Sequence, residues 1–96
     1  MRRAAKVDRN QAEIVDALRK AGATVQSLAA VGGGVPDLLC GFRRQTFLLE
    51  VKDGKQPPSA RELTPDQVAW HLAWGGGVCV VVNSVDEALA AIGATK

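Results

Sequence analysis

The chain has 96 residues, of which 47% are hydrophobic, so it can bury one modest core and we expect a single domain over residues 1–96. A formal net charge of +2 is too small for composition alone to indicate a nucleic-acid binder. The lack of tyrosine excludes tyrosine-nucleophile chemistry, the single histidine argues against nucleases that need several, and no phosphate-binding loop motif predicts a nucleotide cofactor. Without a secretory signal or an apolar run of about 18 residues, we expect a soluble cytoplasmic protein that does not contact a membrane.

The predicted elements begin with a helix over about residues 9–21, which Asp8 or Asn10 can cap and which Gly22 ends. Its apolar side is formed by Ile14, Leu18 and, less strongly, Val15 and Ala21. A weaker strand is predicted over 24–30, just before a run of three glycines.

A β-hairpin follows, because the hydrophobic segments 38–42 and 46–51 flank the polar break Arg43-Arg44-Gln45. If the two arginines form a two-residue turn, the cross-strand pairs place Asp37 directly opposite Glu50. A three-residue loop would shift the register by one residue and separate the acids, and type I′ turns prefer Asn-Gly or Asp-Gly. The two-residue turn also predicts one apolar face, formed by Leu38, Cys40, Phe42, Phe47, Leu49 and Val51.

The two acids and a nearby lysine indicate metal chemistry. Opposed side chains on antiparallel strands lie roughly 4.5–5.5 Å apart at Cβ, where like charges repel, so a positive group is expected between Asp37 and Glu50. The strand period of two puts Lys52 on the same face as Glu50. Mg²⁺ or Mn²⁺ prefers oxygen ligands, and a bound ion can activate water for attack on phosphorus while a lysine stabilises negative charge. An alternative is that this spacing arises by chance, with Glu50 and Lys52 forming an exposed ion pair on an ordinary strand.

A polar loop comes next, over about residues 53–62, and it is expected to be exposed and mobile around Pro57-Pro58. The helix after it begins with Thr64 as N-cap, Pro65 at N1 and Gln67 at N3, which completes a capping box. Capping and catalysis are therefore competing roles for the glutamine.

The same helix carries Trp70 and Trp74 at i, i+4 spacing, which favours contacts in the core or between subunits over a platform for stacking bases. An apolar run over 78–82 then predicts a buried strand with both faces covered. A second capping box at 84–87 precedes a last short helix.

Four motifs occur in a fixed order along the chain. They are Glu13 in the first helix, Gly34-Val35-Pro36-Asp37-Leu38, Leu49-Glu50-Val51-Lys52 and Leu63-Thr64-Pro65-Asp66-Gln67. This combination resembles the VRR-NUC group of PD-(D/E)xK nucleases over about residues 9–92, although one or two glycines are expected where this chain has three. The resemblance implies an α/β fold with a restriction-endonuclease-like core, in which a central mixed sheet is flanked by helices in the order α-β-β-β-α-β-α.

The resemblance also implies a role for each site residue. The implied ligands of Mg²⁺ or Mn²⁺ are Asp37, Glu50, the Val51 backbone carbonyl and Glu13. Lys52 would be the catalytic lysine, and Gln67 and Glu13 would be further catalytic residues that line the site.

The predicted function is metal-dependent cleavage of DNA. We expect an endonuclease, and the resemblance alone implies that it is a homodimer acting on branched DNA such as Holliday junctions. The basic residues expected to contact DNA are Lys6, Arg9, Arg43, Arg44 and Lys55. Two alternatives stay open: a non-catalytic nucleic-acid-binding or interaction module with a vestigial site, and a nuclease subunit that needs a partner protein for targeting.

Overall fold

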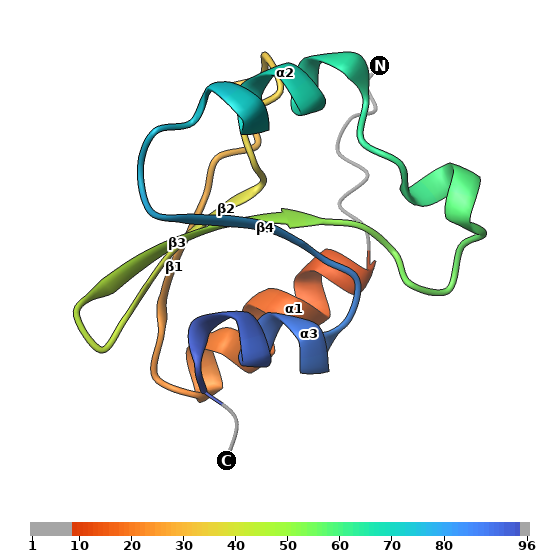
Figure 1. Ribbon diagram of the computed structural model, residues 1–96. Coiled ribbons are helices and arrows are strands. Elements are labelled where there is room, and N and C mark those ends of the chain that lie inside the picture. The colour runs from red at the N-terminus through yellow and green to blue at the C-terminus, as the bar shows by residue number, and fades with distance from the viewer. Residues whose placement is uncertain (1–8, 95–96) are drawn as a thin grey trace.

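The computed structural model describes residues 9–94 and shows a small α/β fold with a four-stranded mixed sheet (Figure 1). The elements are α1 (Arg9–Lys20), β1 (Thr24–Ser27), β2 (Leu38–Phe42), β3 (Gln45–Val51), the short 3-10 helix η1 (Pro58–Arg61), α2 (Pro65–Ala73), β4 (Val78–Val82) and α3 (Val85–Ile92). The strand order is β1-β2-β3-β4, in which β1, β2 and β3 pair antiparallel and β4 is parallel to β3. The predicted α/β class, mixed sheet and order of helices and strands are confirmed.

The sheet separates two layers of helix. Helices α1 and α3 lie side by side against one face, and α2 lies over the other (Figure 1). The core fills the first layer, where Ile14 and Leu18 of α1 are fully buried against the sheet, as predicted. All six side chains of the predicted apolar hairpin face are buried in the same core: Leu38, Cys40, Phe42, Phe47, Leu49 and Val51. The opposite face of the hairpin therefore points toward α2.

The hairpin has the predicted two-residue turn. Phe42 pairs with Gln45 and Leu38 pairs with Leu49, so continuing this register by one residue sets position 37 opposite position 50. Both arginines of the turn have positive φ, 52° at Arg43 and 66° at Arg44, as a type I′ turn requires. A left-handed conformation costs a non-glycine residue about 1–2 kcal/mol. The packed apolar face, which allows only one register, offsets this cost.

Several local predictions are corrected by the structure. The first strand ends at Ser27 rather than residue 30, because the chain then turns where the Val31 N–H donates to the Leu28 carbonyl. Asn10 lies inside α1 and so does not cap it, and Asp8 lies outside the described residues. The region 53–62 is exposed over most of its length, as expected, but it contains η1.

The largest corrections concern β4 and α2. Strand β4 is the edge of the sheet, and Val78 and Val80 are exposed, so the prediction of a strand covered on both faces is wrong. Helix α2 has no buried residue, so its tryptophans are not in the core of this chain. Instead, Trp70 and Trp74 stack on each other with ring centroids 5.0 Å apart. Among residues 9–94, no helix has the length and hydrophobicity needed to cross a bilayer.

Candidate functional site

Two acids meet on the face of the sheet that α2 covers. Asp37 directly precedes β2, and Glu50 lies in β3 on the neighbouring strand. The Asp37 carboxylate accepts a hydrogen bond from the Val51 backbone N–H at 2.8 Å, which fixes it beside β3. Glu50 is almost completely buried, with 2% of its surface exposed, and it interacts with the Asp37 carboxyl group. The structure therefore brings the two predicted acids together.

This environment raises the pKa of Glu50 to about 8. Burial is the largest cause, followed by the hydrogen bond with Asp37 and then by the negative charge of Asp37. Lys52 acts in the opposite direction, because its positive charge favours the carboxylate form. Near pH 7 the acid pair therefore retains a proton, as two carboxyl groups that share a desolvated site generally do.

Gln67 connects the acids to the lysine. Its side-chain NH₂ donates to Glu50 Oε2 at 3.1 Å, and its side-chain oxygen accepts from Lys52 Nζ at 3.0 Å. The same oxygen accepts from the Thr64 backbone N–H at 2.9 Å, while the Thr64 hydroxyl accepts from the Gln67 N–H. The predicted capping box is thus confirmed, and the residue that completes it also contacts two site residues. Gln67 therefore both caps α2 and contacts the site residues Glu50 and Lys52.

The glycine run before Asp37 holds the start of α2 close to the acids. Gly34 has φ +88°, and a Cβ at this position would overlap the backbone carbonyl of Asp66 in the first turn of α2. Gly33 also has positive φ, but space around it is open. The third glycine of the run therefore lets α2 approach the loop closely enough for Gln67 to reach Glu50.

His71 is a site residue that the sequence analysis missed. Its Nε2 lies 3.9 Å from Glu50 Oε1, and its Nδ1 lies 3.6 Å from the sulfur of Cys79 on β4. Residues four apart on a helix share a face, so its spacing from Gln67 was the available signal. Cys79, His71 and Glu50 follow the order of a thiol nucleophile, a base and an acid. However, burial, and less strongly the charge of Glu50, raise the pKa of the Cys79 thiol, which disfavours the reactive thiolate.

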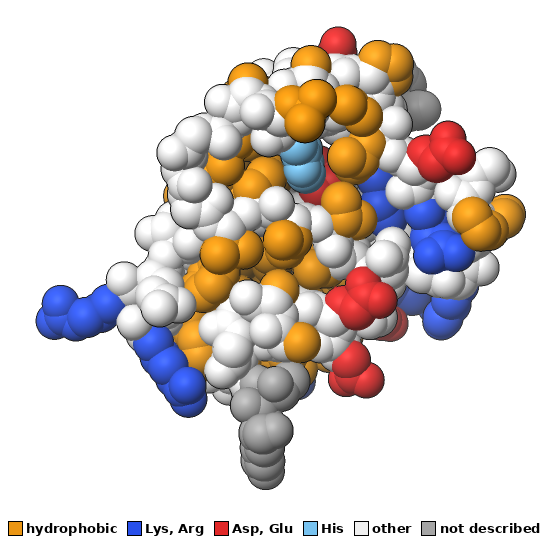
Figure 2. Space-filling model, in the orientation of Figure 1, with side chains coloured by type: hydrophobic (Ala, Val, Ile, Leu, Met, Phe, Trp, Pro, Cys, Tyr) orange, Lys and Arg blue, Asp and Glu red, His pale blue; other side chains and the backbone are white. Residues whose placement is uncertain are grey.

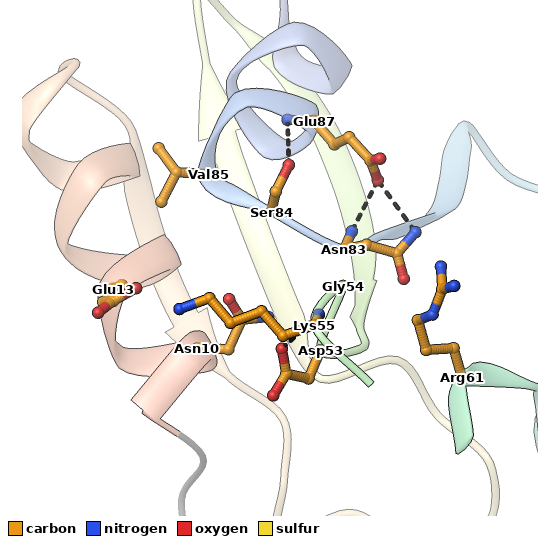
Figure 3. Close-up of a pocket in the computed structure, with 10 residues that line it drawn as sticks. All are labelled: Asn10, Glu13, Asp53, Gly54, Lys55, Arg61, Asn83, Ser84, Val85 and Glu87. Carbon is orange, nitrogen blue, oxygen red and sulfur yellow. Dashed lines mark hydrogen bonds between the residues drawn. The ribbon is translucent and has the colours of Figure 1, made fainter. Parts of the chain in front are cut away.

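Glu13 is not brought to the acid pair. It lies on the exposed side of α1 and lines a separate polar pocket of about 370 Å³, together with Asp53 and Lys55 (Figure 3). The pocket is linked to the main site through the backbone, because the Asn10 side-chain NH₂ donates to the Lys52 carbonyl at 2.7 Å. The expectation that Glu13 lines the same site as the acids is therefore not supported by this geometry.

The predicted DNA contacts are spread over the surface. Arg43 and Arg44 lie at the tip of the hairpin, roughly 20 Å along β3 from Glu50 at the usual rise per strand residue. Arg9 and Lys55 line a polar pocket beside Glu13. Lys6 lies outside the described residues. The basic residues at the hairpin tip therefore could contact only DNA that extends well beyond the acids.

The acid pair has the chemistry of a cation site that substrate and water would complete. Within residues 9–94, no three His, Cys, Asp or Glu side chains are arranged to hold a metal ion. Mg²⁺, however, usually takes only one or two carboxylates and keeps water and phosphate oxygens as its other ligands. Glu50 Oε1 is buried and has no hydrogen-bond partner in the described part of the chain, so it is available to a cation. The groups that would hold one are Asp37, Glu50 and the Val51 carbonyl, which lies between Glu50 and Lys52 in the chain.

Comparisons of the chain with family models, curated proteins and solved structures found no match.

Proposed function

We propose that the chain is a Mg²⁺- or Mn²⁺-dependent endonuclease that hydrolyses phosphodiester bonds in DNA and has a restriction-endonuclease-like core of the VRR-NUC group. The observation that carries the proposal is the meeting of the half-buried Asp37 with the buried Glu50, where burial and Asp37 raise the pKa of Glu50 to about 8. Such a pair is unfavourable for folding unless it has a partner, and perturbed carboxyl groups of this kind cluster at functional sites. A divalent cation is the partner that would replace the proton.

The residues around the pair have separate tasks in this proposal. The Val51 N–H holds Asp37, and Gln67 holds both the Glu50 carboxylate and the Lys52 ammonium group. Lys52 would then stabilise the negative charge that develops on the phosphate and orient the attacking water. A cation bound by the acids would polarise the phosphoryl oxygen and lower the pKa of a coordinated water.

The proposal also includes a homodimer that acts on branched DNA. Its support is the resemblance in motifs together with an apolar surface that this chain leaves uncovered. Figure 2 shows hydrophobic side chains gathered on α2 and over the edge of the sheet at β4. Five large hydrophobic side chains on α2, at its C-terminal end and on β4 are exposed: Val68, Leu72, Trp74, Val78 and Val80. Leu72 is the most exposed of the five, at 83%. A second copy related by a twofold axis would cover such a surface and present two sites to two strands.

A cleavage assay tests the proposed activity. The wild-type chain is incubated with junction, flap, duplex and single-stranded DNA in the presence of Mg²⁺ or Mn²⁺. Lys52→Ala should fold and bind DNA but lose cleavage, because the ammonium group beside the acids is gone. Lys20→Ala removes an exposed lysine on α1 and serves as the matched control. Cleavage by Lys52→Ala at the wild-type rate would refute the mechanism.

The alternatives predict other outcomes of the same assay. A module with a vestigial site would neither cleave DNA nor bind the cation. A subunit that needs a partner would bind the cation and stay inactive on every substrate until the partner is added.

A further inference from the structure

Two buried polar atoms face each other beside the acid pair without a hydrogen bond. They are Glu50 Oε1 and His71 Nε2, and neither finds a partner among the residues that the structure describes. Their side chains are 2% and 15% exposed, so bulk water does not compensate for the missing bonds. A buried polar atom without a partner destabilises the fold, because the hydrogen bonds it made to water in the unfolded chain are not replaced. The pair therefore indicates a group that is bound between the two atoms.

The distance between the two atoms limits which group can lie between them. They lie 3.9 Å apart. A direct hydrogen bond requires about 2.9 Å, and a bridging water with two hydrogen bonds holds its partners roughly 4.6 Å apart. Two donors on one metal ion, each about 2.0–2.2 Å from it, are separated by roughly 3.0–3.5 Å. The observed separation is too long for a direct hydrogen bond and exceeds that of a shared ion by about half an ångström. Among residues 9–94 no three His, Cys, Asp or Glu side chains are arranged to hold an ion as they stand, so the side chains around Glu50 would have to move together by this amount on binding.

We propose that His71 is a ligand of the cation bound by Glu50, and that the site therefore prefers a transition-metal ion such as Mn²⁺ to Mg²⁺. The inference rests on the proposed metal-dependent function and adds a ligand and a selectivity to it. Imidazole is a usual ligand of first-row transition metals, whereas Mg²⁺ prefers oxygen.

The surroundings of the ring suit a metal ligand. A coordinating histidine generally has its second nitrogen held by another group, which fixes the ring and its tautomer. Here Cys79 lies 3.6 Å from Nδ1, and the ring of Trp70 packs edge-on at 6.4 Å between centroids. When the ring proton is on Nδ1, the free lone pair of Nε2 faces Glu50 Oε1. A cation between these two electron-rich atoms removes their repulsion.

The test uses the fact that the chain has one histidine. Untagged wild-type protein is loaded with Mn²⁺ alone and studied by pulsed electron paramagnetic resonance, once with natural-abundance histidine and once with ¹⁵N-labelled histidine. We expect nitrogen modulation of the Mn²⁺ signal that changes on labelling, which only His71 can produce. Bound Mn²⁺ without this modulation would overturn the inference and leave the proposed nuclease intact. No Mn²⁺ binding at all would overturn both.

A variant supplies the second readout, which is metal affinity rather than activity. His71→Gln should weaken Mn²⁺ binding at least about tenfold, since the loss of a supporting residue alone commonly has this effect, and should change Mg²⁺ binding much less. Lys20→Gln alters an exposed residue on α1, away from the acids, and should bind both ions like the wild type. An equal loss of affinity for both ions would show that His71 only positions Glu50, and would overturn the inference.

Discussion

Glu50→Gln should stabilise the metal-free protein at alkaline pH. The substitution keeps the size of the side chain and an oxygen that can accept from Gln67, but it removes the ionisable proton. The folded protein binds this proton more tightly than the unfolded chain, because the pKa of Glu50 rises from its ordinary value of 4.5 to about 8 on folding. Between these values the folded state holds more protons, so the free energy of unfolding falls as the pH rises.

The structure sets the size of this effect. Each pKa unit corresponds to about 1.4 kcal/mol, so the rise from 4.5 to about 8 gives a ceiling of about 5 kcal/mol. The side chains around Glu50 can relax when it ionises, so we expect a loss of roughly 2–4 kcal/mol in the wild type between pH 5 and pH 9. Below pH 4.5 Glu50 is protonated in both states, and the variant and the wild type should have similar stability.

The assay is urea denaturation of both proteins from pH 4 to pH 9 in the presence of a chelator, followed by far-ultraviolet circular dichroism. Other groups titrate in both proteins, so the difference between the two curves isolates Glu50. The variant should become the more stable protein as the pH passes from 5 to 8. A difference that is constant over this range would show that Glu50 carries no perturbed proton, and the account of the acid pair would fail.

Two further predictions concern the loop and the helix that support the acids. Gly34→Ala should destabilise the fold by at least about 2 kcal/mol, because the new methyl group overlaps the Asp66 carbonyl at a positive φ. Gly33→Ala should lower the stability by only about 1 kcal/mol, because the space around Gly33 is open. Equal losses of the two variants in urea denaturation would contradict the close approach of α2. Gln67→Ala and Thr64→Ala each remove one side of the capping box and should lower stability by about 1 kcal/mol. Only Gln67→Ala also releases Lys52 and Glu50, so cleavage should fall by roughly 10–100-fold in that variant alone, and equal rates in the two variants would exclude a role for Gln67 beyond capping.

The hairpin and its acid pair could be predicted from sequence because they depend on local pattern. Alternating apolar residues and a two-residue break fix the register, and the register sets Asp37 opposite Glu50. The turn itself runs against local preference. Two arginines adopt the left-handed conformation because a packed apolar face leaves the hairpin one register, and Arg43 also lies over the Phe42 ring at 4.8 Å.

The rest of the fold depends on contacts between distant segments. The apolar composition of β4 cannot distinguish a central strand from an edge strand, since strand order is not encoded in five residues. The i, i+4 spacing of Trp70 and Trp74 predicts contacts in the core or between subunits, and only the packing of α2 shows that they are not in the core of this chain. Glu13 lies away from the acids because the packing of α1 on the sheet, and not its own spacing, directs its side chain. His71 was missed although it is one helical turn from Gln67, because only the packing of α2 on β3 brings it to Glu50.

Calorimetric titration of the wild-type chain with Mn²⁺, with Asp37→Asn as the comparison, tests the central claim most directly. The account predicts stoichiometric binding that releases a proton from the acid pair, so the measured heat should depend on the ionisation enthalpy of the buffer near pH 7. Asp37→Asn should bind the ion much more weakly, because one of the two carboxylates is lost. Absence of stoichiometric heat in the wild type, or equal binding by the variant, would contradict a cation site at Asp37 and Glu50.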